Sequence, residues 1–233
     1  DTVGGDTNGD GAVSAPAAGD WYGINVGGGA SKLGLNEVTM RYGSSLSAFE
    51  VGSVVVTSSR FVQGVLVDLG RNTGNLPLTF TGNTLSAVGA ADSGLSVRAY
   101  DSTAGVINAA PVVRDNVVSG AVRWGTPDTR GGRAISLYGP NLDPAKFSGN
   151  TGSGNTQNAL FLSGTLIGSA TLPAAGLPWV IGDYYVQSLT VAKGVTLTLN
   201  AGAVLKAAPG SSLSVQGSLV AAGTAAAPVT FTS

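Results

Sequence analysis

The sequence contains no cysteine and no histidine among its 233 residues. Without cysteine, the chain can form neither a disulfide framework nor a thiolate metal site. Without histidine, it lacks the usual general base of enzymes and the commonest protein ligand of transition metals. These two absences remove many hydrolases and zinc proteins from the candidate functions.

Charge is also scarce, because only 11% of the residues are charged and the formal net charge is −1. No basic run occurs, so we expect neither nucleic acid nor an anionic membrane surface as a partner. No apolar run approaches the roughly 18 residues of a transmembrane helix, so membrane insertion is not expected. The first residues carry no signal peptide, and Asp1 is interpreted as a cut within a longer protein.

Glycine, by contrast, is abundant, with 36 residues against an ordinary usage of about 7%. Valine and leucine are too frequent, and charge too rare, for a disordered chain. In residues 194–233, short apolar runs recur every six to ten residues between Gly, Ala, Pro, Ser or Asn. Val195, Leu197 and Leu199 alternate with threonines, which predicts a β-strand. Short strands joined by such small turns predict a parallel solenoid, in which each turn covers the one before it.

Elsewhere the pattern predicts longer strands at Trp21–Val26, Leu35–Tyr42, Val54–Val62 and Trp179–Val186. The stretch from residue 158 to residue 187 is less regular than the rest, but no composition break predicts a domain boundary. Trp21 or Tyr22 is interpreted as a cap on the core, since large aromatic side chains bury much area. The alternative is that these two rings form a carbohydrate platform.

An internal repeat occupies residues 64–154. The motifs FTGN, VRDN and FSGN end at Asn83, Asn116 and Asn150, at spacings of 33 and 34 residues, and Ser59 stands in the matching place upstream. Asparagines at a fixed position of successive turns can form an internal amide ladder that satisfies backbone groups. We therefore predict a structural role for them, with ligand binding as the alternative.

These motifs, together with the final stretch LTVAKGVTLTLNAGAVLKAAPGSSLSVQGSLVAAGTAAAPVTFTS, resemble the right-handed parallel β-helix superfamily, the fold of pectate lyases and of many bacterial surface proteins. In large secreted proteins of this kind, a sequence motif like PVTFTS is followed directly by a DxxGGDTNGDG…GDW loop. In this chain the PVTFTS motif is at the C-terminal end, whereas the loop is at the N-terminal end, as Asp1–Trp21. The resemblance implies an all-β, right-handed parallel β-helix that forms one period of a tandem array. It divides the chain into a junction loop at 1–20 and a single β-helix domain at 21–233.

The function implied by this resemblance is structural. We expect a repeat unit of an extracellular bacterial fibre, filament or adhesin at the cell surface, whose adjoining copies meet head to tail. In that arrangement Val229–Thr232 of one unit docks on Trp21–Val26 of the next. The alternative is a module that binds or degrades carbohydrate, with cell-surface glycans as partners.

The junction loop matches the first half of a calcium-binding loop. Asp6, Asn8 and Asp10 provide oxygen ligands at alternate positions and a glycine follows, which is the spacing that wraps a chain around Ca²⁺. Loop position twelve is Ala17 instead of glutamate. The full predicted set of Ca²⁺ ligands is Asp6, Asn8, Asp10, the Ala12 carbonyl and Asp20, with Ser14 as a further donor. The alternative is an Asp/Asn/Gly-rich turn without metal.

No catalytic residues are predicted. Glycan cleavage needs clustered carboxylates, or Ca²⁺ with a basic residue, and the carboxylates outside the loop are scattered singly. The best local cluster is Asp115 and Arg114 with Arg98 or Arg123, which we interpret as exposed ion pairs between turns, of little energetic value. An ice-binding surface is a third alternative, but pairs such as Thr196 and Thr198 are not evenly repeated.

Overall fold

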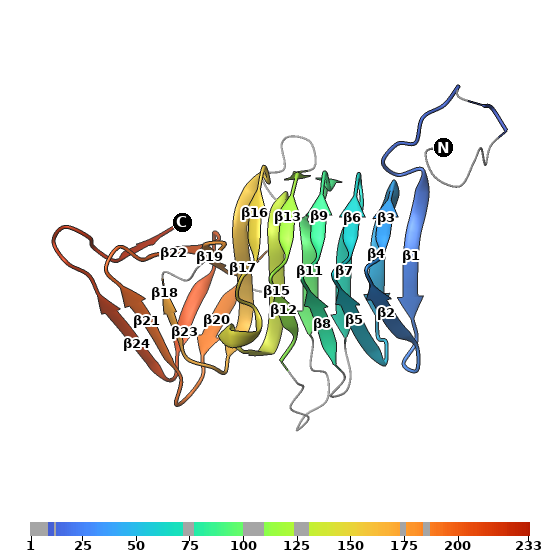
Figure 1. The fold of residues 1–233 in the computed structure, drawn as a ribbon. Helices are drawn as coiled ribbons and strands as arrows, with labels where there is room; N and C mark the ends of the chain where they lie inside the picture. Colours follow the sequence, from blue (N-terminus) through green and yellow to red (C-terminus); the bar gives the residue numbers. More distant parts are fainter. Residues whose placement is uncertain are drawn as a thin grey trace.

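The computed structural model describes residues 9–11, 13–71, 77–99, 110–123, 131–172, 176–183 and 187–233. They form a parallel β-solenoid of about eight turns (Figure 1). Every pairing between described strands is parallel. Among the described residues, the helical content is one short 3-10 helix, η1 (Pro144–Lys146). The predicted all-β parallel β-helix is confirmed.

One sheet of 11 strands, here called sheet A, runs the whole length of the solenoid. Its main path, in spatial order, is β1 (Trp21–Gly27), β4 (Gly43–Phe49), β7 (Leu66–Arg71), β11 (Ser93–Ala99), β15 (Arg133–Leu142), β17 (Gln157–Leu166), β19 (Trp179–Ile181), β22 (Val204–Ala207) and β25 (Thr230–Thr232). At β17 the sheet divides, because one end of this strand pairs with β19 and the other with β20 (Ser188–Val191). Strand β20 then pairs with β23 (Ser212–Val215).

Smaller sheets form the other sides. Sheet B contains β2 (Lys32–Asn36), β5 (Ser53–Thr57), β8 (Leu78–Thr81) and β12 (Val112–Arg114). Sheet C contains β3 (Thr39–Arg41), β6 (Arg60–Val62), β9 (Thr84–Ser86), β13 (Val117–Ser119) and β16 (Thr151–Ser153). Sheet D pairs β10 (Gly89–Ala90) with β14 (Ala121–Val122), and sheet E contains β18 (Ala170–Leu172), β21 (Thr196–Asn200) and β24 (Ser218–Ala222).

The core consists of apolar side chains that point inward from every other residue of a strand. In sheet A, one inward position per turn forms an apolar column, which we call the core column. Its members are Ile24, Leu46, Val67, Leu95, Ile135, Leu160, Trp179, Leu205 and Phe231. Each turn therefore buries the apolar layer of the turn before it, as expected of a solenoid.

Two long strands predicted from the sequence are wrong. Leu35–Tyr42 is broken into parts of β2 and β3, and Val54–Val62 is broken into β5 and β6. The breaks lie at Glu37 and Ser58, whose φ angles of 56° and 49° are in the left-handed region. Because non-glycine residues rarely adopt this conformation, their sequence gives no turn signal. Trp179–Val186 is also shorter than predicted, because β19 ends at Ile181; residues 184–186 lie outside the described residues.

The asparagine ladder is confirmed. Asn83, Asn116 and Asn150 are at most 3% exposed. The side-chain oxygen of each accepts the backbone N–H of the equivalent residue one turn earlier: Ser59 N–H to Asn83, Asn83 N–H to Asn116, and Asn116 N–H to Asn150, at 2.8, 3.0 and 3.1 Å. Their amide groups donate to buried carbonyls of Val56, Phe80 and Val113. The ladder therefore satisfies backbone groups at the corner between sheets B and C.

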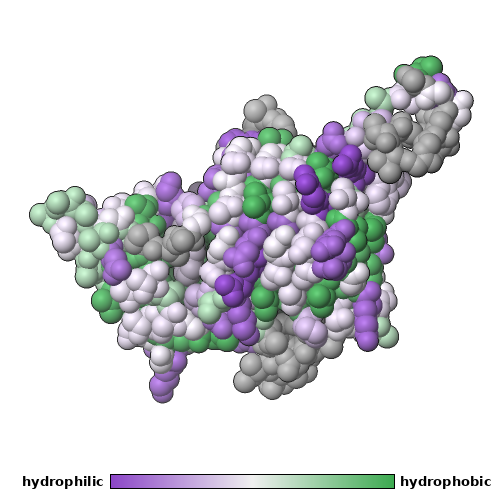
Figure 2. Space-filling view, viewed as in Figure 1, coloured by the Kyte–Doolittle hydropathy of each residue, from purple (hydrophilic) through white to green (hydrophobic). Residues whose placement is uncertain are grey.

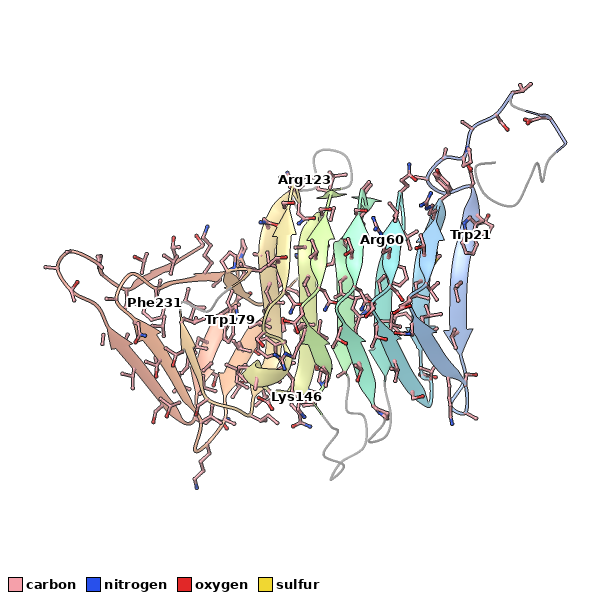
Figure 3. All side chains as sticks on the ribbon, in the orientation of Figure 1. Trp21, Arg60, Arg123, Lys146, Trp179 and Phe231 are labelled. Carbon is pink, nitrogen blue, oxygen red and sulfur yellow. The ribbon has the colours of Figure 1, made fainter. Side chains whose placement is uncertain are left out.

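At the N-terminal end, the Trp21 ring packs beside Met40 over Gly43, where an added Cβ would lie 3.1 Å from the ring. Its Nε1 donates to the Arg41 carbonyl at 2.9 Å. Trp21 is nevertheless 42% exposed and Tyr22 is 95% exposed, so Trp21 covers the edge of the first turn only in part and Tyr22 does not cap the core. Trp21 and Phe231 lie at opposite ends of the solenoid (Figure 3). The described part of the chain has no helix of the length and hydrophobicity needed to cross a membrane.

Candidate functional site

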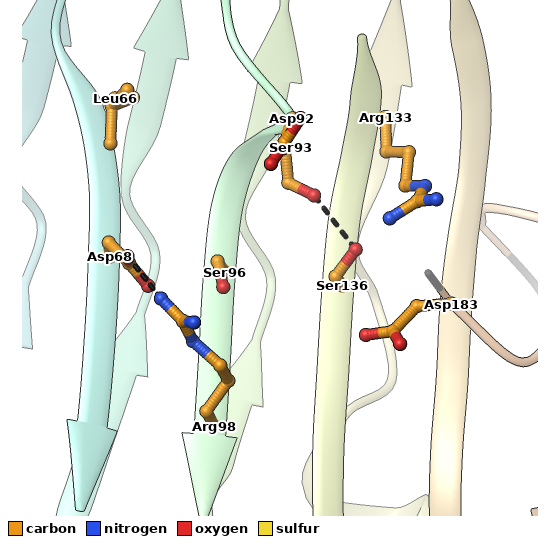
Figure 4. A pocket seen from close by; sticks show the side chains of 9 residues that line it. All are labelled: Leu66, Asp68, Asp92, Ser93, Ser96, Arg98, Arg133, Ser136 and Asp183. Atoms are coloured by element: carbon orange, nitrogen blue, oxygen red, sulfur yellow. Dashed lines mark hydrogen bonds and ion pairs between the residues drawn. The ribbon is translucent and has the colours of Figure 1, made fainter. Parts of the chain in front are cut away.

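The outer face of sheet A contains a polar hollow of about 210 Å³ over strands β7, β11 and β15 (Figure 4). This region, which we call the serine hollow, is lined by Leu66, Asp68, Asp92, Ser93, Ser96, Arg98, Arg133, Ser136 and Asp183. Figure 2 shows the visible face of the molecule as mostly pale, with hydrophilic residues in scattered groups over the central turns.

The floor of the serine hollow is made of three serines. Ser96 and Ser136 occupy equivalent outward positions on β11 and β15. The hydroxyl of Ser93 lies 2.8 Å from that of Ser136 in a buried hydrogen bond. Because these side chains are short while their neighbours are long, the surface is recessed here and presents hydroxyl groups.

One wall of the hollow is the ion pair between Asp68 on β7 and Arg98 on β11. The Arg98 guanidinium also lies 5.2 Å from the centroid of the Phe49 ring. Phe49 can lie flat on the sheet because the next strand has glycine at position 70, where a Cβ would come within 2.4 Å of the ring. Side chains from three successive turns thus fix this wall in place.

The opposite wall carries Arg133, Asp92 and Asp183. Arg133 is only 8% exposed, and its guanidinium lies 4.7 Å from the centroid of the Phe161 ring, a cation–π geometry. Phe161 packs with Ala159 and Val180 in a small apolar cluster separate from the main core. The buried arginine is therefore held against the sheet, on the same side of the hollow as Asp183 (Figure 4).

A second, larger hollow of about 690 Å³ continues from the first, since Arg133 and Asp183 line both. It adds the amide side chains of Gln157, Asn158 and Gln187 and the ammonium group of Lys206, over a partly apolar floor. The combined groove presents hydroxyls, amides and charges of both signs. Such a surface can hydrogen-bond a hydroxyl-rich ligand without requiring that ligand to be charged.

A second surface of interest is the C-terminal end, where inward-facing side chains are uncovered. Phe231 is 54% exposed, although Leu205, the preceding member of the core column, is 2% exposed. Leu219 on β24 is 37% exposed, whereas its partner Leu197 one turn earlier is fully buried. The described residues therefore end in an exposed apolar layer and an unpaired sheet edge.

Three of the five predicted Ca²⁺ ligands, Asp6, Asn8 and Ala12, lie outside the described residues. The Ser14 hydroxyl donates to a carboxylate oxygen of Asp10 at 2.6 Å, so these two expected donors are adjacent. Asp20 accepts the Ala17 N–H at 2.7 Å. Within the described ranges, no three His, Cys, Asp or Glu side chains are grouped to hold a metal. Calcium binding stays a prediction.

The predicted grouping of Arg98 with Asp115 is wrong. Arg98 lies in sheet A and pairs with Asp68, whereas Asp115 follows β12 of sheet B. Asp115 instead lies beside its chain neighbour Arg114, at 3.9 Å, and both side chains are largely exposed. The serine hollow itself was not predicted. Its carboxylates come from different turns, and no local sequence signal places them together.

The chain matches no family model, no curated protein and no solved structure. The fold therefore defines its class, which is that of the parallel β-solenoids.

Proposed function

We propose that this protein is a structural repeat unit of an extracellular fibre, filament or adhesin, and that copies of it stack end to end. The solenoid is built from near-neighbour layers, so adding a further layer needs no new kind of contact. Its outer surface carries little charge, and its length is set by the number of turns. These features suit a stiff element of adjustable length.

The observation that carries this proposal is the parallel stacking itself, since every described turn of sheet A covers the apolar layer of the turn before it. An exposed strand edge is a template for pairing with another chain. Half-covered Phe231 exposes roughly 100 Å² of apolar surface, and covering it would contribute about 2–3 kcal/mol. Val215 and Leu219, at 41% and 37% exposure, add to this driving force. A second copy provides both a strand edge and an apolar layer.

Phe231→Asp should weaken end-to-end association at least about 100-fold, because burying an unpaired carboxylate costs several kcal/mol. Thr232→Asp is the matched control: it adds the same charge to the same strand at an outward position and should associate like the wild type. Light scattering against concentration, with circular dichroism to verify folding, measures both. A wild-type protein that stays monomeric at the highest attainable concentration would contradict the proposal.

Calcium at the junction loop is the second component of the proposal. If Ca²⁺ binds only the folded protein, a concentration of 100 times Kd should stabilise it by about 2.7 kcal/mol, or roughly 5–10 °C for a chain of this size. Chelation should remove this gain, and Asp10→Ala should abolish the response. The control Asp115→Asn changes an exposed aspartate far from the loop, and this variant should still be stabilised by calcium and destabilised by chelation. Equal responses to calcium in both variants would count against this site.

A second candidate function, glycan binding without catalysis, is favoured by the serine hollow and its extension. The groove combines hydroxyl and amide groups with a buried, positioned guanidinium, and it lies on a rigid sheet face. Carbohydrate binding needs many hydrogen bonds to side chains that are already fixed. In a mobile site, the entropy lost on ordering the side chains would cancel much of the binding free energy.

Ser96→Leu should abolish glycan binding, because the larger side chain fills the floor of the serine hollow. Ser47→Leu is its control, since Ser47 is an outward serine of the same sheet column but lies outside the hollow. A glycan array followed by calorimetry on the strongest hit would test this. We expect at least a tenfold loss of affinity for Ser96→Leu alone. A glycan array without hits would contradict this candidate function. An equal loss of glycan affinity in Ser96→Leu and Ser47→Leu would contradict it as well.

A further inference from the structure

The wall of the solenoid is interrupted between η1 and β18. Sheet B ends at β12, and in the following turn η1 takes the place of a strand. The N–H groups of Lys146 and Phe147 bond carbonyls within this short segment, at 2.8 and 3.4 Å. Among the described strands, β18 pairs only with β21, in sheet E. No strand pairing therefore joins η1 to β18 in the described part of the chain.

The turn that contains β18 touches the turn below it on both sides of this interruption. At Gly168, an added Cβ would lie 2.9 Å from a carboxylate oxygen of Asp143 and 3.1 Å from Pro144. On the other side, the Leu177 N–H bonds the Asn150 carbonyl at 3.1 Å. Between these two contacts lies a pocket of about 170 Å³, which we call the seam pocket.

The seam pocket has an apolar interior and a polar rim. Its interior is lined by four buried side chains: Phe147, Leu160, Leu177 and Trp179. The ring centroids of Phe147 and Trp179 are 5.4 Å apart, and the rings are tilted by 52°. The exposed residues Ser148 and Thr171 provide hydroxyl groups at the rim. No charged side chain is among the described residues that line this pocket.

We propose that the seam pocket binds a small, neutral, monocyclic aromatic molecule of about the size of phenol. Its volume is close to that of an apolar cavity of about 150 Å³ that binds benzene in another protein. A bound ring can pack edge to face against Phe147 and Trp179, the arrangement that aromatic rings prefer at centroid distances of about 4.5–7 Å. A charged ligand is disfavoured, because burying an unpaired charge is costly.

A polar substituent on the ring would point to the rim. Asn150 also lines the pocket, but its side-chain oxygen accepts the Asn116 N–H and its amide group donates to the Val113 and Phe147 carbonyls. The hydroxyls of Ser148 and Thr171 are therefore the groups that would hydrogen-bond a phenolic hydroxyl. The pocket lies in the middle of the solenoid, so this inference does not depend on end-to-end stacking.

Titration of the full chain with phenol tests the proposal, with cyclohexanol as the aliphatic comparison. We expect phenol to bind with a Kd of about 1 mM, as for a ligand of few atoms, and to shift the Trp179 indole N–H resonance in NMR spectra. Cyclohexanol should bind roughly two- to tenfold more weakly, because it lacks the ring–ring contacts. At about ten times Kd, phenol should raise the unfolding temperature by roughly 3–6 °C.

Ala170→Leu should weaken phenol binding at least about tenfold, because the partly buried Ala170 lines the pocket and a larger side chain fills the space for the ring. Ala222→Leu is the matched control on exposed β24 of the same sheet, outside the pocket, and should bind phenol like the wild type. If Ala170→Leu does not fold, Ala170→Val fills less space and should still bind at least about threefold more weakly.

Three results would overturn the proposal. The first is wild-type protein without saturable phenol binding or a shift of the Trp179 resonance. The second is equal affinity for phenol in the Ala170 and Ala222 variants, which would place the ligand elsewhere. The third is tighter binding of cyclohexanol than of phenol, which would contradict an aromatic ligand. None of these results bears on end-to-end stacking, which light scattering measures separately.

Discussion

Replacing Asn116 by alanine should lower the free energy of unfolding by about 3–5 kcal/mol. Asn116 is fully buried, donates to the Phe80 carbonyl at 2.9 Å and accepts the Asn83 N–H at 3.0 Å. Its removal takes away the side-chain acceptor of the buried Asn83 N–H and one hydrogen bond of the Phe80 carbonyl, which also lies in the pairing of β8 with β12. An unsatisfied buried group costs about 1–3 kcal/mol, and the cavity left by the side chain adds to this loss. This is a large fraction of the 5–15 kcal/mol that ordinarily stabilises a domain.

Two further variants separate the ladder from simple packing. Asn116→Leu keeps the volume but removes the hydrogen bonds, so it should be as destabilised as Asn116→Ala. Asn200→Ala removes an exposed asparagine at the end of β21 and should change stability by no more than about 0.5 kcal/mol. Urea denaturation gives all three values. Full recovery of stability by Asn116→Leu would show that the amide bonds contribute little.

Gly164→Ala should be among the most damaging glycine-to-alanine substitutions in the described residues, with a loss of more than about 3 kcal/mol or no folded protein. The backbone at Gly164 has a φ of 111°, and an added Cβ would lie 2.0 Å from the Gly139 carbonyl oxygen. That oxygen belongs to the neighbouring strand of sheet A and cannot move without breaking the pairing of β15 with β17. The left-handed φ adds a further penalty.

The matched control is Gly34→Ala in β2, where nothing lies within 4 Å of the added Cβ. We expect it to be neutral or to stabilise by about 0.5 kcal/mol, since glycine weakens the interior of a strand. Thermal unfolding measures both.

If Gly164→Ala does not fold, Gly139→Ala is a milder variant of the same strand pair, because its Cβ would come no closer than 3.3 Å to a neighbouring atom. It should fold with a loss of no more than about 2 kcal/mol. Equal stability of the Gly34 and Gly164 variants would refute the steric argument.

The sequence was sufficient to predict the solenoid and the ladder, because both depend on regular spacing. The asparagine motifs recur every 33 or 34 residues, and each marks the same corner. The corners at Glu37 and Ser58 could not be predicted in this way. There the turn is imposed by the turns stacked on it, which hold a non-glycine residue at positive φ. Tertiary context overrides local preference at these positions.

The serine hollow could not be predicted for a different reason. Turns in the middle of the chain have unequal lengths, so that Val67 pairs with Leu95 after 28 residues and Leu95 with Ile135 after 40. Without the register, the sequence cannot show that Ser96 and Ser136 share a column, or that Asp68 lies beside Arg98. Asp183 is farther still along the chain. Residue types were informative only once the turn boundaries were known.

The uniform direction of the strands has one more consequence. Because all of sheet A runs one way, any fibre assembled from this unit has polarity: one tip presents β1 and the other β25. Contacts between unlike surfaces do not close on themselves by a twofold axis, and they generate open filaments when the rotation does not form a ring. A unit with an intact β1 but a blocked β25 would therefore act as a terminator, capping growth at a single tip.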